Sequence, residues 1–337
     1  MFRAALVGHW HPHSHYPDAR YAKEFLAQPD CSVTCVWDPD EETAKNWAAE
    51  YNADYSTDLE AVISRNDVDA VIVTSKPDDH MAIFTMACKY HKHIFTEKVL
   101  SFRSDEAQKI SRMVKESGIK FAIAFTRIGI PQLAYARKLV EDGTLGTPVL
   151  FRCLCGHAQG VKDTLPPYWY DASLTGGGAM IDLGFNSAYL ARYIMGPFTS
   201  VSSSFSNTVI HKQVEDCASC NVLFANNAMG LIDATFDSPC MSVFELQVYG
   251  TKGSYYARFG GSDVAELNLD GKGHEILELQ SLSKEIRPPV TTWVHACVND
   301  TDVGPYGIDF AVDMVRFMEA AYQSARENGK RVPVLHE

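Results

Sequence analysis

A turn rich in histidine follows the first apolar segment of the chain. Gly8 comes directly after the apolar residues 4–7, and histidine then occupies positions 9, 11, 13 and 15. A turn that binds a dinucleotide at the end of a strand has the pattern G-x-G-x-x-G. Only its first glycine is present here, because Trp10 and His13 stand at the other two positions.

The histidines of this turn are interpreted first as solvated loop residues. A polar lining for a phosphate or a sugar is the alternative. Alternate spacing would place His9, His11, His13 and His15 on one face of a strand, but Pro12 interrupts that geometry. Metal sites need converging ligands, and no acidic cluster lies nearby in the sequence, so we predict no metal.

A carboxylate ends the second predicted strand. Asp38 follows residues 33–37, at a place where an acidic side chain accepts hydrogen bonds from an adenosine ribose. The same carboxylate would repel the 2′-phosphate of NADP, so NAD is the predicted cofactor. Alternatively, residues 38–40 form the N-cap and first turn of the next helix. Spacing alone leaves both interpretations open.

The elements that must position these residues alternate along the first part of the chain. β-Branched runs predict strands at residues 4–7, 33–37, 53–55, 70–74, 93–96 and 121–125. Helical patterns lie between them; Ala44, Trp47, Ala48 and Tyr51, for example, form one apolar stripe. This alternation predicts an α/β fold with a doubly wound Rossmann domain at residues 1–125.

The second part of the chain has a different pattern. Helices are predicted at 131–142, 178–194 and 308–327, and strands at 199–205, 217–224, 228–236, 243–249, 253–258 and 264–269. Sequential strands joined by polar turns predict an α+β domain at 126–337 with a large, mostly antiparallel sheet. Residues 285–305, with Pro288, Pro289 and Trp293, are predicted to be irregular and to line a pocket or a subunit contact.

Five motifs in order resemble those of the Gfo/Idh/MocA family of oxidoreductases. That family has a strand ending in T-P-x-x-x-H, a second strand ending in E-K-P, an N-R-R-like triplet, a G-G-G-x-x-x-D helix start and a Y-G-t-k-G turn. The matching segments here are 74–80, Glu97-Lys98-Val99, Phe125-Thr126-Arg127, 176–182 and 249–253. The resemblance extends from about residue 3 to residue 325.

The resemblance implies oxidation or reduction of a sugar or polyol hydroxyl by NAD(P). It further implies a homodimer or homotetramer assembled through the second domain. By position, Lys98 would reach the oxygen of the reacting carbon, Asp38 would bind the ribose, and Glu97 would touch the nicotinamide ribose. The other implied cofactor residues are Gly8, His9, Trp10, His11, His13, Ser75, Pro77, His80 and Arg127.

The sequence departs from the family at the general base. Asp182 and Asn186 lie four apart on one helix, and the family usually has histidine at the second position. An asparagine amide does not accept a proton at neutral pH. We therefore expect Lys98, together with Asp182, to handle the proton; a relay through Asp182 or an imidazole from His157 is the alternative. Trp169 is expected to stack on the sugar, or else to pack within its loop.

The sequence is compatible with two other functions. One is a hydrolase or lyase in which NAD oxidises the sugar transiently to a keto-sugar. The other is a sensor that binds dinucleotide and sugar without turnover. Net release of NADH distinguishes a dehydrogenase from both.

Composition excludes several classes of protein. The 337 residues carry 30 Lys and Arg against 42 Asp and Glu, a net charge of −12, which argues against binding to nucleic acid or anionic membranes. No apolar run approaches the length of a membrane span and no signal-like segment is evident, so a cytoplasmic protein is expected. Nine scattered cysteines, an odd number, predict reduced thiols rather than a disulfide framework.

Overall fold

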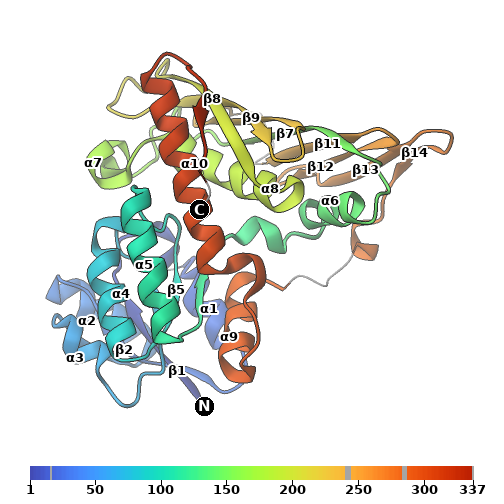
Figure 1. The fold of residues 1–337 in the computed structure, drawn as a ribbon. Coiled ribbons are helices and arrows are strands. Elements are labelled where there is room, and N and C mark those ends of the chain that lie inside the picture. Colours follow the sequence, from blue (N-terminus) through green and yellow to red (C-terminus); the bar gives the residue numbers. More distant parts are fainter. Residues whose placement is uncertain (16, 240–243, 283–286, 336–337) are drawn as a thin grey trace. The chain divides into compact units, whose positions relative to one another are not determined.

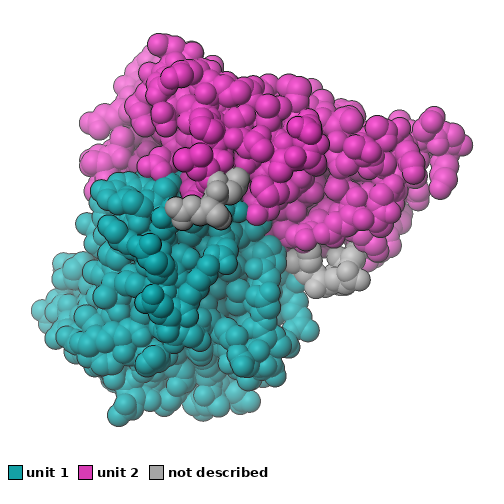
Figure 2. All heavy atoms as spheres, in the orientation of Figure 1, with its two compact units in different colours: residues 1–124, 287–315 teal, residues 125–286, 316–337 magenta. Residues whose placement is uncertain are grey.

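A computed structural model describes residues 1–15, 17–239, 244–282 and 287–335. The chain forms two compact units (Figure 2). Unit 1 comprises Met1–Ala124 and Arg287–Val315, and unit 2 comprises Phe125–Ile286 and Arg316–Glu337. No helix among the described residues is both long and apolar enough to cross a membrane.

Unit 1 contains a six-stranded, wholly parallel sheet in the order β3-β2-β1-β4-β5-β6. Its strands are β1 Phe2–Val7, β2 Cys31–Trp37, β3 Asp54–Ser56, β4 Ala70–Val73, β5 His93–Thr96 and β6 Phe121–Ile123. Its helices are α1 Arg20–Leu26, α2 Glu41–Tyr51, α3 Leu59–Ile63, α4 His80–Lys89, α5 Ser104–Ser117 and α9 Pro289–Asn299. The predicted Rossmann architecture and all six of its strands are confirmed.

Capping side chains define where the helices of unit 1 begin. Asp40 accepts a hydrogen bond from the backbone N–H of Thr43 at 2.8 Å and so starts α2. Asp58 does the same for α3 through the N–H of Ala61 at 3.1 Å. Each of these two helices follows a strand after a short loop. The helix then carries the chain back to the edge of the sheet at which the next parallel strand begins.

An irregular segment was expected at residues 285–305, and this prediction is wrong for the described residues 287–305. Most of this segment is helix α9, which packs against α1, β5 and β6 (Figure 1). Trp293 is fully buried, and its ring lies 5.8 Å from Phe2 and 5.6 Å from Phe95. It belongs to the core of unit 1, whereas the predicted second domain, residues 126–337, included it. Residues 283–286 lie outside the described residues.

Unit 2 is built on a nine-stranded sheet in the order β14-β13-β12-β11-β7-β10-β9-β8-β15. The strands are β7 Pro148–Gly156, β8 Phe198–Ser206, β9 Cys217–Phe224, β10 Met229–Thr235, β11 Phe244–Gly250, β12 Gly253–Phe259, β13 Val264–Leu269, β14 Gly273–Ile276 and β15 Val332–Pro333. Neighbours are antiparallel except β7 and β10. The mostly antiparallel sheet is thus confirmed; β7, β14 and β15 were not predicted.

Helices cover one face of this sheet. α6 Pro131–Glu141 packs on β12, α8 Phe185–Met195 packs on β7 and β10, and α10 Ile308–Arg326, which continues from unit 1, contacts β8 through the stacked rings of Phe317 and Phe198. The short helix α7 Ala172–Thr175 contacts the 3-10 turn Pro167–Tyr170. Side chains of β9 alternate accordingly: Cys217 is exposed and Cys220 is buried. All eight cysteines in the described part of the chain are free.

Candidate active site

The turn after β1 lies at the carboxyl edge of the sheet in unit 1. Strands β2, β1, β4 and β5 are neighbours, so Asp38, Gly8, Ser75 and Glu97, which follow them, lie at one edge. This edge contains the reversal of strand order at which doubly wound sheets bind ligands. The structure therefore brings together the predicted cofactor residues of unit 1.

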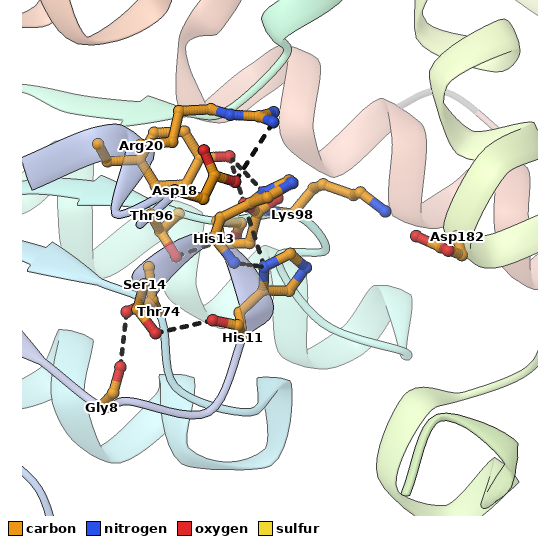
Figure 3. Close-up of polar contacts among 12 residues, drawn as sticks. Gly8, His11, His13, Ser14, Asp18, Arg20, Thr74, Thr96, Lys98 and Asp182 are labelled. Carbon is orange, nitrogen blue, oxygen red and sulfur yellow. Dashed lines mark hydrogen bonds and ion pairs between the residues drawn. The ribbon is translucent and has the colours of Figure 1, made fainter. Parts of the chain in front are cut away.

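Gly8 occupies a backbone conformation that other residues rarely adopt. Its φ is +79°, and a Cβ added there would lie 2.5 Å from the Cβ of Ser75. The Thr74 hydroxyl donates to the carbonyl oxygen of Gly8 at 2.6 Å (Figure 3). The His11 N–H donates to the carbonyl of Thr74 at 3.0 Å. The turn is thus held against the end of β4. Thr74 was not predicted as a site residue, although its place directly after a buried strand could have indicated it.

Asp38 holds the same turn from the other side. Its Oδ2 accepts the backbone N–H of His9 at 2.8 Å, and its Oδ1 accepts that of Asp40 at 3.0 Å. Asp40, rather than Asp38, caps helix α2. The carboxylate of Asp38 is buried at the end of β2, and Asp40 supplies the helix N-cap that the alternative interpretation placed within residues 38–40.

The rings of His9 and His15 lie together. Their centroids are 4.3 Å apart, and His9 also lies 4.7 Å from Trp47 of α2. Burial, followed by the repulsion of His15, lowers the pKa of His9 to about 4. His9 is therefore neutral near pH 7 and supplies no positive charge to a phosphate.

His11 and His13 instead surround the carboxylate of Glu97. The Nδ1 atom of His13 lies 2.8 Å and that of His11 3.7 Å from Oε2 of Glu97. The Tyr21 hydroxyl donates to the same oxygen, and the Lys98 backbone N–H donates to Oε1 at 2.9 Å. Burial alone would raise the pKa of Glu97, but the two imidazoles hold it below its ordinary value. Tyr21 had no local signal in the sequence, because it belongs to an unremarkable stretch of α1.

Of the remaining predicted cofactor residues of unit 1, all but Trp10 follow β4. Pro77 begins a short 3-10 turn, and His80 begins α4 with its ring buried. The Nδ1 atom of His80 donates to the carbonyl of Leu100 at 3.0 Å, and burial lowers its pKa to about 4. The hydroxyl of Ser75 is buried and has no hydrogen-bond partner among the described residues. A bound polar group would satisfy it. Trp10 is partly buried, with its ring 6.3 Å from that of His11.

Unit 2 brings three of its predicted residues together. Met180–Gly184 form a π-helical turn before α8, a feature often found at functional sites. Asp182 lies on this turn, and its Oδ2 accepts the indole N–H of Trp169 at 3.2 Å. Asn186, in the first turn of α8, donates from Nδ2 to the backbone carbonyl of Asp182 at 3.3 Å. The three side chains are predicted to bind the substrate.

Two further predicted residues of unit 2 lie elsewhere in that unit. His157 follows β7, and its ring is stacked on Phe236 at 5.1 Å with the two planes 4° apart. The guanidinium of Arg127 lies 5.7 Å from the ring of Phe244 and 5.6 Å from that of Phe259. An aromatic environment of this kind is a favourable one for an arginine.

A pair of carboxyl groups lies near the end of β10. Asp216 is fully buried, and its Oδ2 accepts the backbone N–H groups of Thr208, Val209 and Ile210 at 2.7, 2.6 and 3.2 Å. Burial and then the neighbouring Asp216 raise the pKa of Asp237 to about 6. Asp237 thus retains its proton in the folded protein at pH values where a free aspartate is ionised.

We expect Asp237→Asn to stabilise the protein at pH 8 but not at pH 4. Unfolded aspartate ionises near pH 4, whereas folded Asp237 ionises at about 6. Between these values the folded state binds the extra proton, so stability falls as the pH rises. Asparagine does not ionise and escapes that loss. Thermal unfolding of both proteins at each pH measures the difference, with exposed Asp270→Asn as the control. An equal change in Tm at both pH values would contradict the assignment.

A parallel sheet with this polar edge, followed by a large second sheet, defines a class of dinucleotide-dependent oxidoreductases. Residues 3–125 match the family model "Oxidoreductase family, NAD-binding Rossmann fold", and residues 133–256 match "GFO/IDH/MocA C-terminal domain". The chain belongs to the Gfo/Idh/MocA family of NAD(P)-dependent oxidoreductases, which confirms the resemblance drawn from its motifs.

Several relatives are similar over most of the chain. Scyllo-inositol 2-dehydrogenase (NAD(+)) of Bacillus subtilis is 28% identical over 303 residues, which cover 83% of this chain and 86% of that protein. The uncharacterized oxidoreductase YrbE of the same organism is 29% identical over 67% of this chain and just under two thirds, 66%, of its own length. The fold matches that of levoglucosan dehydrogenase in complex with NADH, with a TM-score of 0.88 and 19% identity over 100% of both chains.

Proposed function

We propose that the protein is an NAD-dependent dehydrogenase that oxidises a secondary hydroxyl of a sugar or polyol, or reduces the corresponding ketone. The observation that carries the proposal is the convergence of Gly8, Asp38, Ser75 and Glu97 at the strand-order reversal of a parallel sheet. Relatives named as scyllo-inositol, levoglucosan and D-xylose dehydrogenases support the substrate class.

The residues at this edge fit a dinucleotide. Gly8 has a positive φ, and its close contact with Ser75 leaves no room for a side chain. The buried Ser75 hydroxyl lacks a hydrogen-bond partner among the described residues. In the proposal the turn at 8–13 faces the pyrophosphate and Asp38 accepts hydrogen bonds from the ribose. Ser75, Pro77, His80, Glu97 and Arg127 complete the cofactor contacts. When bound, the nicotinamide ring accepts the hydride.

The side chains of the protein supply positioning and proton transfer. Lys98 follows Glu97 at the end of β5, and its backbone is fixed by the hydrogen bond to that carboxylate. We assign to Lys98 the acceptance of the hydroxyl proton as the hydride leaves, because Asn186 lacks a basic atom. Asp182 supports this transfer, and Trp169, Asn186 and His157 orient the substrate.

The direct test is a titration with NAD and NADH, followed by a panel of sugars and polyols monitored at the nicotinamide absorbance. We expect saturable dinucleotide binding and NADH formation that depends on at least one polyhydroxylated substrate. Binding without net reduction would replace the proposal by transient redox chemistry or by a sensor. Failure to bind any dinucleotide would show that Trp10 and His13 close the site.

Asp38 should determine the choice between NAD and NADP. We expect the wild-type kcat/KM to favour NAD, and Asp38→Asn to reduce that preference by about tenfold or more, because it removes the repulsion of the 2′-phosphate. Asparagine can still accept the N–H of His9, so the turn should persist. Asp40→Asn is the matched control, since asparagine caps a helix equally well. An unchanged NAD/NADP ratio in Asp38→Asn would remove Asp38 from the cofactor site.

A further inference from the structure

One cluster of side chains in unit 1 has the composition of a transition-metal site. Among the described residues, His11, His13 and Glu97 form a group in which one ligand atom from each lies within 4.8 Å of the others. No metal was expected here, because no acidic cluster lies near the histidines along the chain. The missing carboxylate is contributed by Glu97, at the end of β5.

The distances in this cluster are close to those of a coordinated ion. Bonds of about 2.1 Å from a tetrahedral zinc ion place neighbouring ligand atoms about 3.4 Å apart. The His11 and Glu97 atoms are 3.7 Å apart, and the His13 and Glu97 atoms are 2.8 Å apart. The Nδ1 atom of His11 also accepts the backbone N–H of His13 at 3.1 Å, so a bound ion would replace that hydrogen bond.

The surroundings hold two of the three ligands in place. Glu97 and His11 are buried, with 2% and 5% of their surfaces exposed. The Tyr21 hydroxyl and the Lys98 N–H donate to Glu97, as outer hydrogen bonds commonly do for metal-binding carboxylates. The backbone of His11 is anchored to Thr74 at 3.0 Å. Figure 3 shows His11 and His13 together on this turn.

We propose that His11, His13 and Glu97 form a binding site for a divalent transition-metal ion. Two imidazoles and one carboxylate favour zinc-like ions over Mg²⁺ or Ca²⁺, which prefer ligand sets made only of oxygen. A divalent cation would also compensate the negative charge of a buried carboxylate between two imidazoles. Three protein ligands leave at least one coordination position open.

The inference goes beyond the proposed function and does not depend on it. His11, His13 and Glu97 are also among the residues proposed to face the dinucleotide, so metal binding is measured in its absence. Full-length protein without a histidine tag is freed of metal with a chelator and then titrated with Zn²⁺ by equilibrium dialysis. A parallel titration with Co²⁺ reports imidazole and carboxylate coordination through its visible absorption bands.

We expect one tightly bound Zn²⁺ per chain in the wild type, with an affinity about tenfold or more lower in His13→Gln and in Glu97→Gln. His13→Gln is the principal variant because the His13 side chain is 26% exposed and the substitution should leave the fold intact, which circular dichroism verifies. His15→Gln is the matched control: it lies on the same turn, but its ring contacts His9. Its affinity should equal that of the wild type.

Two results would overturn the proposal. One is a wild-type protein that binds Zn²⁺ no more tightly than a folded His11→Gln/His13→Gln double variant. The other is stoichiometric binding that persists in His13→Gln, because the ion would then be held elsewhere, for example by the exposed thiol of Cys217.

Discussion

Lys98→Ala is expected to lower kcat by about a thousandfold while changing the Kd for NAD by less than about threefold. Hydride transfer from a secondary alcohol requires the hydroxyl proton to leave, and positioned acid–base groups contribute about 10²–10⁴ to such steps. Asn186 cannot take that proton, and truncation of Lys98 leaves the backbone hydrogen bond to Glu97 in place. Initial rates of NADH formation and a fluorescence titration with NAD separate the two effects.

Lys76→Ala is the matched control for this experiment. Lys76 also lies at the carboxyl edge of the sheet, directly after Ser75, but its ammonium is partly exposed and lies 3.7 Å from the carboxylate of Asp79. An exposed ion pair of this kind contributes little, so kcat should remain within about twofold of the wild type. Full activity in Lys98→Ala would transfer the role of base to Asp182 or His157, the alternatives weighed from the sequence.

Gly8→Ala is expected to destabilise the protein by about 3 kcal/mol or more and to abolish dinucleotide binding. A left-handed backbone costs alanine about 1 kcal/mol or more, and a clash in a packed interior costs a further 1–3 kcal/mol or so. Both apply here, because φ is +79° and the new Cβ would lie 2.5 Å from Ser75 Cβ and 2.6 Å from Ser75 Cα. The backbone atom cannot rotate away as the end of a side chain could. Chemical denaturation and an NAD titration measure the two losses.

Gly118→Ala isolates the backbone component of that effect. Gly118 ends helix α5 with a φ of +69°, but a Cβ there would have no atom within 4 Å. Its cost should be the strain alone, about 1 kcal/mol. Equal losses in the two variants would mean that the contact with Ser75 does not explain why glycine is needed at position 8.

Local sequence patterns were sufficient to predict the sheet of unit 1. Short β-branched runs identified its strands, and alternation with helices then implies a parallel sheet with one ligand-binding edge. The same edge brings Gly8, Asp38 and Ser75 together, as expected. These predictions succeeded because each depends on contiguous residues and on the limited ways in which βαβ units connect.

Other features depend on information that local patterns do not contain. Pro288 and Pro289 suggested an irregular segment, but proline is well tolerated in the first turn of a helix, and Pro289 begins α9. Strand β7 lacks the clean alternation seen in β9 and was overlooked. The hydrogen bond between His13 and Glu97 joins residues 84 positions apart, so only the folded sheet reveals it.

The return of the chain to unit 1 affects how the protein can be made. Trp293 fills the space beside Phe2, Phe25 and Phe95, and it is synthesised long after the last strand of its sheet. On the ribosome, the N-terminal part must therefore wait, with aromatic surface uncovered, until nearly the whole polypeptide has emerged. A gene fragment ending near codon 125 would encode a sheet that lacks part of its own interior. For recombinant work, the dinucleotide-binding half has to be expressed with residues 287–315 attached or together with the rest of the chain.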